Sequence, residues 1–348
     1  MPWTTVAMEE LFVDDGFFQG DKQGRQITFG NALLEAQTQA LRQDPRVFVM
    51  GQGADDPKGI FGTTLDLHKE FGAVRNFDTP IAENSMTGIA MGAAVAGLRP
   101  IIVHMRMDFL MVAMDQIVNE IAKWKYMSGG KVSVPLVIRT IIGRGWGSAA
   151  QHSQSLQAMF THIPGLKVVM PSTPYDAKGT LIASIMDDSP VIFIEHRWLY
   201  NYSGYVPEHV FGAPLGKGAV RREGGDVTVV AISIQNIEAL KAAVQLEDSG
   251  IDVEVVDPVT LKPLDEDIIF QSVKKTGRLV IADTGNINSG FSAEIAARVS
   301  EKCFADLKAP IIRIGAPDTP VPASSILEKA YYTDQSDIQE AVRKVIEY

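Results

Sequence analysis

Short runs of apolar, often β-branched residues alternate along the first 200 residues with longer stretches whose apolar positions recur at helical spacing. The runs are almost uniformly apolar, which favours a parallel sheet covered on both faces over half-exposed antiparallel strands. Strands separated by helices indicate right-handed βαβ units and a doubly wound α/β fold. The predicted strands are 46–50, 99–105, 135–141, 167–170 and 190–195, and the predicted helices are 31–43, 86–96, 109–126 and 175–186.

The alternation pauses over residues 198–218, which are rich in Tyr, Gly and Pro, and then resumes. Further strands are predicted at 227–233, 252–257, 278–283 and 311–315, with a helix at 237–248. We therefore expect two doubly wound α/β domains joined by a linker. The expected limits are an N-terminal extension over 1–25, a first domain over 26–205, a linker over 206–217 and a second domain over 218–348.

The composition is that of a globular enzyme rather than a nucleic-acid-binding protein. The 348 residues are 46% hydrophobic and 21% charged, and their net charge of −10 disfavours binding to phosphate backbones or anionic membranes. The lone Cys303 excludes a disulfide framework, and no apolar run approaches about 18 residues. The amino terminus resembles neither a signal peptide nor a transit peptide, so we expect a cytoplasmic protein.

Several common motifs are absent from the sequence. It contains no GxxxxGK[ST] phosphate-binding loop, no GxSxG nucleophile turn and no HExxH pair. The glycines at 143, 145 and 147 resemble a dinucleotide loop, but the third is one position early and no acidic residue follows at the expected distance. This segment is interpreted as a tight loop between a strand and a helix.

The stretch 78–97 carries the first candidate for chemistry. Glu83 follows a strand that ends near Asp78, and it precedes a helix rich in Gly and Ala. Ligands bind at the carboxyl ends of parallel strands, which makes Glu83 a candidate site residue, although an acidic residue there also complements the helix dipole. The small residues lower helix propensity and are best explained by close approach of another backbone.

Two other segments are open to a functional and a structural interpretation. His152, within QHSQS (151–155), is either an acid–base group or an ordinary loop residue, and Ser153 or Ser155 can cap the following helix. Phe109 begins a helical pattern whose apolar positions more often belong to a core than to a ligand platform.

A series of segments along the chain carries a resemblance to one family. The segments are DTPIAE (78–83), GIAMGAAVAGLRP (88–100), DF and DQIVNEIAKWKYMSGG within 108–130, QHSQS (151–155), HIPGLKVVMPSTPYDAKG (162–179), PVIFIEHRWLY (190–200), TLKPLD (260–265) and GFSAEIAARV (290–299). Taken together, they resemble the beta subunit of the thiamine-diphosphate-dependent dehydrogenase component of 2-oxo acid dehydrogenase complexes, a family that includes pyruvate, branched-chain and acetoin dehydrogenases. The resemblance covers nearly the whole chain after about residue 25 and implies a pyrimidine-binding domain followed by a transketolase-type C-terminal domain.

The resemblance implies roles for individual residues. Glu83 matches the catalytic glutamate that hydrogen-bonds the pyrimidine of the cofactor. Phe109 matches an aromatic residue that packs on the same ring, and Met105 lies on the approaching strand in the same cofactor-binding pocket. His152 matches a catalytic histidine at the mouth of the site that assists acyl transfer. A possible K⁺ site, which mainly uses backbone carbonyls, aligns with Leu136, Ser184, Asp187 and Ser189.

The sequence lacks the Gly-Asp-Gly segment through which such enzymes hold Mg²⁺ and the diphosphate. Because Mg²⁺ takes oxygen ligands together with phosphate oxygens, another chain must supply that half of the site. The resemblance implies that this chain is an alpha subunit in an α2β2 heterotetramer. It further implies an oxidoreductase that decarboxylates a 2-oxo acid and transfers the acyl group to lipoyl-lysine on an acyltransferase core.

Two alternatives remain open at this point: a split transketolase-like carboligase that forms C–C bonds without oxidation, and a catalytically silent subunit. Some positions also depart from the pattern of the family. Gln52 stands where relatives usually carry a glutamate, and His104 and Arg106 replace residues that are more often neutral. Arg106 either meets a substrate carboxylate or forms a structural ion pair. These departures leave the 2-oxo acid unassigned.

Overall fold

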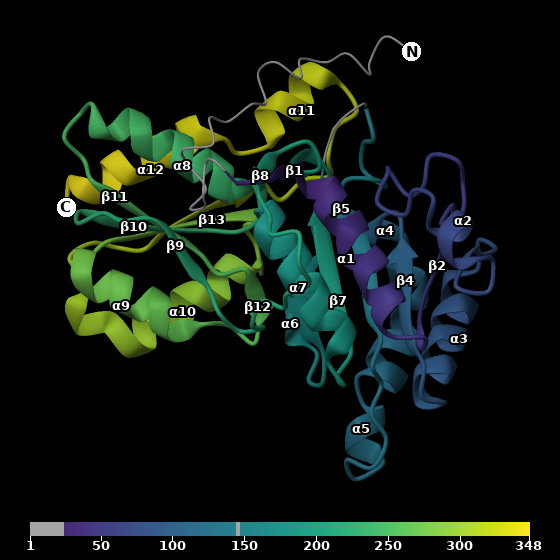
Figure 1. Cartoon of the computed structure of the whole chain (residues 1–348). Helices are drawn as coiled ribbons and strands as arrows, with labels where there is room; N and C mark the ends of the chain where they lie inside the picture. Colours follow the sequence, from purple (N-terminus) through teal and green to yellow (C-terminus); the bar gives the residue numbers. More distant parts are fainter. Residues whose placement is uncertain (1–23, 144–146) are drawn as a thin grey trace. The chain divides into compact units, whose positions relative to one another are not determined.

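The computed structural model describes residues 24–143 and 147–348, which form two compact units (Figure 1). The first unit contains residues 24–143 and 159–215, and the second contains residues 147–158 and 216–348. Each unit is an α/β body, as the alternating pattern predicted. Residues 1–23 of the predicted extension and residues 144–146 of the glycine loop lie outside the described residues.

The sheet of the first unit is parallel, because each strand returns through a crossover before the next one begins. The strand order is β3 (Asn76–Asp78), β2 (Val47–Gly51), β4 (Arg99–His104), β5 (Val137–Ile142), β7 (Val191–His196) and β6 (Lys167–Val169). Strands β5 and β7 are buried along their whole length, which explains why most of their residues are apolar. A separate antiparallel pair joins β1 (Gln26–Thr28) to β8 (Ser203–Tyr205).

Helices α1 (Phe29–Gln43) and α7 (Pro174–Met186) pack against each other beside this sheet (Figure 1). The side-chain oxygen of Thr28 caps α1 by accepting from the Asn31 N–H at 3.2 Å, and Thr173 caps α7 in the same way. Helix α3 (Glu83–Val95) packs against β4 and the segment that follows it. Two short helices, α2 (Leu67–Phe71) and α6 (Gln157–His162), also precede β7 in the chain.

The prediction of one continuous helix over 109–126 was wrong. The segment consists of α4 (Met107–Leu110), a 3-10 turn (Met111–Ala113), a π-helix (Gln116–Ile121) and α5 (Trp124–Met127). Apolar side chains recur every three to four residues in all of these forms, so hydrophobic periodicity does not reveal where the backbone hydrogen-bond pattern changes.

The sheet of the second unit has four parallel strands and one antiparallel edge strand. Their order is β14 (Ile312–Ala316), β13 (Leu279–Asn286), β10 (Val227–Ala231), β11 (Val253–Asp257) and β9 (Ala219–Arg222). The edge strand β9 escaped prediction because its four residues are all half-buried and it lacks an apolar run. The short strand β12 (Thr260–Lys262) follows β11 in the chain.

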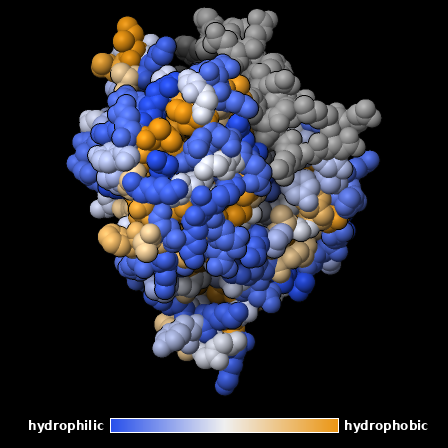
Figure 2. Space-filling view, turned by 90° about the vertical axis from the view of Figure 1, so that its left-hand side faces the viewer, coloured by the Kyte–Doolittle hydropathy of each residue, from blue (hydrophilic) through white to orange (hydrophobic). Residues whose placement is uncertain are grey.

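Helices cover both faces of this second sheet (Figure 1). One pair is α8 (Ile234–Glu247) and α12 (Gln335–Ile346), and the other is α9 (Glu266–Thr276) and α10 (Phe291–Cys303), while α11 (Ser325–Tyr331) follows β14. Val229, Val255 and Val280 from three adjacent strands form the core with Leu240 and Val342. The face shown in Figure 2 is mainly hydrophilic, with small separated hydrophobic patches.

Candidate active site

The carboxyl ends of three adjacent parallel strands bring the first candidate residues together. Strand β2 ends at Gly51, β3 ends at Asp78, and β4 ends at His104, directly before Met105. Helix α3 begins at Glu83, five residues after β3, and Glu83 is the acidic residue of its first turn. The half-buried carboxylate therefore lies at the edge of the sheet where open α/β folds bind ligands.

The turn after β2 contacts Glu83 through Gln52 and lies close to Met105 at Gly53. Gln52 Nε2 donates a hydrogen bond to Glu83 Oε1 at 3.1 Å, and the next residue, Gly53, donates its N–H to Asp78 Oδ1 at 2.6 Å. Gly53 has a φ of +73°, and a Cβ there would lie 3.7 Å from the Met105 methyl carbon. Sequence reasoning noted Gln52 as a departure but missed its contact with Glu83, because the pairing of β2 with β3 creates that contact.

His104, the last residue of β4, is a buried and neutral imidazole. Burial lowers its pKa to about 4, and the nearby charge of Glu83 opposes that shift. His104 Nε2 and Thr87 Oγ1 lie 3.1 Å apart and share a hydrogen bond. Glu83 therefore has a neutral ring as its neighbour near pH 7, not a cation.

The residues after β4 include one exposed aromatic ring and one buried guanidinium. Phe109 in α4 is 39% exposed, whereas Met107 and Leu110 beside it are buried, so Phe109 is the side chain of this turn that is open to a ligand. Arg106 is buried and donates to the Gly143 carbonyl at 3.1 Å. At least one N–H group of the Arg106 guanidinium is therefore bound to the backbone.

His152 belongs to the second unit, within the segment 147–158. The side chain of His152 is exposed, and its backbone N–H donates to the Ala149 carbonyl at 3.4 Å. Gln157, farther along the segment, donates to Asp283 Oδ1 on β13 at 2.7 Å. Burial raises the pKa of Asp283 despite this bond and three backbone donors. The segment of His152 is thus anchored to the second sheet.

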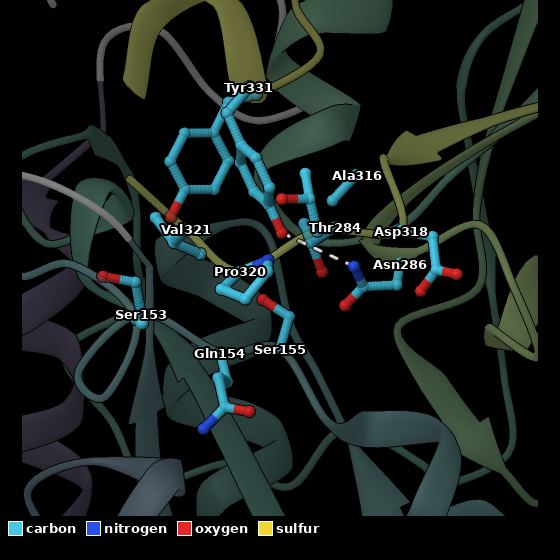
Figure 3. Close-up of a pocket in the computed structure, with 13 residues that line it drawn as sticks. Ser153, Gln154, Ser155, Thr284, Asn286, Ala316, Asp318, Pro320, Val321 and Tyr331 are labelled. Carbon is cyan, nitrogen blue, oxygen red and sulfur yellow. Dashed lines mark hydrogen bonds between the residues drawn. The ribbon is translucent and has the colours of Figure 1, made fainter. Parts of the chain in front are cut away.

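A cavity of about 290 Å³ lies beside the same segment (Figure 3). Ser153, Gln154 and Ser155 line one side, and Asn286 and Tyr331 come from the ends of β13 and α11. Asn286 Nδ2 donates to the Pro317 carbonyl at 2.7 Å and contacts Tyr331 Oη at 3.5 Å. Sequence reasoning missed Asn286 and Tyr331, since they are more than 130 residues from the loop and belong to no motif.

The four residues of the proposed cation site lie directly before β5, in α7 and in the turn that follows α7. The Leu136 carbonyl accepts from the Val191 N–H at 2.9 Å, and Ser184 Oγ donates to the Thr180 carbonyl at 2.6 Å. Asp187 pairs with Lys167 and accepts from the Ser189 N–H at 2.8 Å, and although burial opposes the shift, these contacts lower the pKa of Asp187.

The guanidinium of Arg99 is already hydrogen-bonded to backbone carbonyls at the proposed cation site. Arg99 Nη1 donates to the carbonyls of Ile185 and Asp187 at 3.0 and 3.1 Å. Over residues 24–143 and 147–348, no group of three or more His, Cys, Asp or Glu side chains is arranged to hold a metal. In the same residues, no helix is long and apolar enough to cross a bilayer.

Two family models match this sequence: the transketolase pyrimidine-binding domain over residues 25–203 and the transketolase C-terminal domain over residues 216–338. The chain is 49% identical over 319 residues to the acetoin:2,6-dichlorophenolindophenol oxidoreductase beta subunit of Bacillus subtilis, covering 88% of this chain and 93% of that relative. It is 46% identical to the pyruvate dehydrogenase E1 beta subunit of Rickettsia felis, with 93% and 99% covered. The chain belongs to the family of 2-oxo acid dehydrogenase beta subunits.

The other relatives agree with this family. The 2-oxoisovalerate dehydrogenase beta subunit of Bacillus subtilis is 40% identical, covering 92% of this chain and 99% of the relative. A solved structure of a split-gene transketolase, described as an inactive beta4 tetramer, matches with a TM-score of 0.74 at 25% identity, covering 92% and 98% of the two chains. These matches confirm the family and the α/β fold class, and they favour an oxidoreductase subunit over the carboligase alternative.

Proposed function

We propose that this chain is the beta half of a thiamine-diphosphate-dependent enzyme that oxidatively decarboxylates a pyruvate-like 2-oxo acid and transfers the acyl group to lipoyl-lysine. The observation that carries the proposal is the half-buried Glu83 carboxylate, held by Gln52 at the strand ends beside Met105. A carboxyl in this position suits proton exchange with a ring nitrogen.

The residues at the strand ends fit the pyrimidine half of thiamine diphosphate. Glu83 would hold a proton at the pyrimidine nitrogen, and the Met105 side chain and the exposed Phe109 ring offer apolar contacts to a flat ring. When bound, thiamine diphosphate supplies the carbon nucleophile that attacks the 2-oxo carbon. His152 would assist the acyl transfer.

An alpha subunit would supply the Mg²⁺ ligands in an α2β2 heterotetramer, because this sequence lacks a Gly-Asp-Gly segment. The exposed side of α3 is the surface we assign to that partner. Ser85, Ile89, Gly92 and Ala96 follow one another at helical spacing and are exposed, with Ile89 57% accessible. The nearby Ile81 is also exposed, so the small residues stand beside apolar side chains that a partner would bury.

Further parts of the proposal concern the setting of the enzyme. The acidic chain suits docking to a basic binding domain of an acyltransferase core, and we place the enzyme in the cytoplasm.

A K⁺ ion would be held mainly by backbone carbonyls of Leu136, Ser184, Asp187 and Ser189. It would compete with Arg99, which already donates to two carbonyls there. The domain limits 26–205 and 218–348 stay predictions.

The test is to co-purify the chain with its alpha partner and to supply a 2-oxo acid and an artificial electron acceptor. We expect reduction of the acceptor that depends on the 2-oxo acid. Formation of ketol products alone would support the carboligase and contradict the dehydrogenase. No turnover of either kind, in an assembly that binds thiamine diphosphate and Mg²⁺, would indicate the silent subunit.

A further inference from the structure

Gln52 donates a hydrogen bond to Glu83. The amide of Gln52 cannot titrate, whereas the carboxyl of Glu83 must exchange a proton. Gln52 Nε2 lies 3.1 Å from Glu83 Oε1, and both side chains are half-buried. We infer that Gln52 is a positioning residue for the cofactor: its amide occupies one carboxyl oxygen of Glu83 and leaves the other for the pyrimidine nitrogen. This inference rests on the function proposed above.

The chemistry of the amide explains the selectivity between the two oxygens. An amide N–H₂ group only donates, so Oε1 of Glu83 must act as the acceptor. A proton carried by Glu83 then belongs on Oε2, the oxygen that Gln52 does not contact. Because the amide neither gains nor loses a proton near neutral pH, this arrangement does not change as Glu83 changes state.

The backbone around Gln52 is held tightly enough to aim its side chain. Gly51 lies so close to β4 that a Cβ there would be 2.5 Å from the Val103 carbonyl oxygen. On the other side, Asp78 accepts the Gly53 N–H, and the Asn76 side chain donates to the Ala54 carbonyl at 3.1 Å. The turn 51–54 is thus tied to β3 and β4, and side chains on such supports keep their geometry when a ligand binds.

The surroundings of Glu83 make the amide contact consequential. His104 is buried and neutral, so it does not provide a positive charge to orient the carboxylate. Asp78 is engaged with the backbone of Gly53 and Thr79. Without the Gln52 donor, the Glu83 side chain would gain rotamers at the amino end of α3, and fewer of them would direct a carboxyl oxygen at the pyrimidine.

A pair of ligands separates orientation of Glu83 from general shaping of the pocket. One ligand is thiamine diphosphate, and the other is an analogue in which C–H replaces the pyrimidine nitrogen, so that it cannot bond to Glu83. Both affinities are measured at saturating Mg²⁺ in the assembly with the alpha partner. A hydrogen bond to a charged group corresponds to about 10-fold to 100-fold in affinity, and we expect the wild type to prefer the natural cofactor by about that ratio.

The decisive variant is Gln52→Met, which keeps the length of the side chain and removes the donor. We expect its preference for the natural cofactor to fall to a few-fold, with the affinity for the analogue unchanged. The matched control is Lys58→Met, an exposed position after the same turn, which should leave both affinities unchanged.

Each other outcome overturns a specific claim. If Gln52→Met weakens both ligands equally, the residue only shapes the pocket and the inference is wrong. An unchanged preference in Gln52→Met also contradicts the inference but leaves the proposed function intact. If the wild type itself shows no preference, the proposed role of Glu83 fails, and the inference fails with it.

Discussion

The side chains of Thr87 and His104 meet at 3.1 Å, one helical turn after Glu83 on the same side of α3. Strand β4 supplies the histidine, and the helix supplies both the hydroxyl and the carboxylate. The contact ties the second turn of α3 to the sheet. It also leaves an imidazole that is almost completely buried and uncharged next to the candidate site.

This buried histidine predicts a specific loss of stability in acid. The folded pKa of His104 is about 4, below its ordinary value of 6.5, so the unfolded chain takes up the proton first as the pH falls. The stability that neutral, buried His104 contributes is complete above pH 6.5 and is lost as the pH falls toward 4. Between pH 7.5 and pH 5, wild type should lose about 2 kcal/mol more in the free energy of unfolding than His104→Gln.

Urea unfolding of the isolated chain at the two pH values measures this difference. His162→Gln is the control, because His162 is exposed at the end of α6 and should leave the wild-type loss unchanged. Equal losses for wild type and His104→Gln would show that His104 is not neutral and buried in solution.

A second prediction concerns the ion pair between β5 and β7. Arg139 donates to both carboxylate oxygens of Glu195, at 2.5 and 2.8 Å, and neither side chain is exposed. Glu195→Gln would leave the guanidinium buried without its counter-charge, at a cost of about 3–5 kcal/mol in the free energy of unfolding. Arg42 and Glu70 form a comparable but exposed pair, and Glu70→Gln should cost under about 1 kcal/mol.

Urea unfolding of both variants checks this contrast. Similar costs at the two positions would mean that burial does not determine the energetics of these pairs.

A third prediction concerns the exposed side of α3. A Cβ at Gly92 would meet nothing within 4 Å in this chain, so Gly92→Leu should fold normally as an isolated chain. If the alpha subunit packs against this side, the larger side chain should weaken co-purification of the two subunits by at least 10-fold in apparent affinity.

Ala297→Leu, on the exposed side of α10, is the control and should assemble like wild type. Full assembly of Gly92→Leu would place the partner elsewhere.

A fourth prediction follows from the divided cofactor site. The isolated chain should bind thiamine diphosphate at least 100-fold more weakly than the assembly does at saturating Mg²⁺, because the diphosphate lacks its metal ligands. Isothermal titration of both preparations makes the comparison. Tight binding by the isolated chain that also depends on Mg²⁺ would overturn the assignment of those ligands to the alpha subunit.

Much of the fold could be predicted because buried parallel strands leave a clear signal. The mostly apolar runs that became β5 and β7 are examples, since both faces of each strand are covered. Local form was harder to predict. The half-buried edge strand β9 gave no apolar run, and the segment after β4 kept helical spacing while its backbone changed from α to π.

The candidate site divides in the same way. Glu83 and Met105 carry signals in the sequence, since Glu83 follows a strand within a family motif and Met105 ends a predicted strand. The amide that holds Glu83 carried no such signal, because the contact depends on the register between β2 and β3. Asn286 and Tyr331 of the cavity were likewise invisible, as only the folded second unit places them beside Ser153.

The most direct test of the central claim is the turnover of Glu83→Gln in the assembly with the alpha subunit, measured with a 2-oxo acid and an artificial electron acceptor. An amide keeps the size and hydrogen bonding of the side chain but cannot exchange the proton. The account predicts a loss of about 10²-fold or more in kcat, with assembly intact. Turnover equal to that of wild type would contradict it.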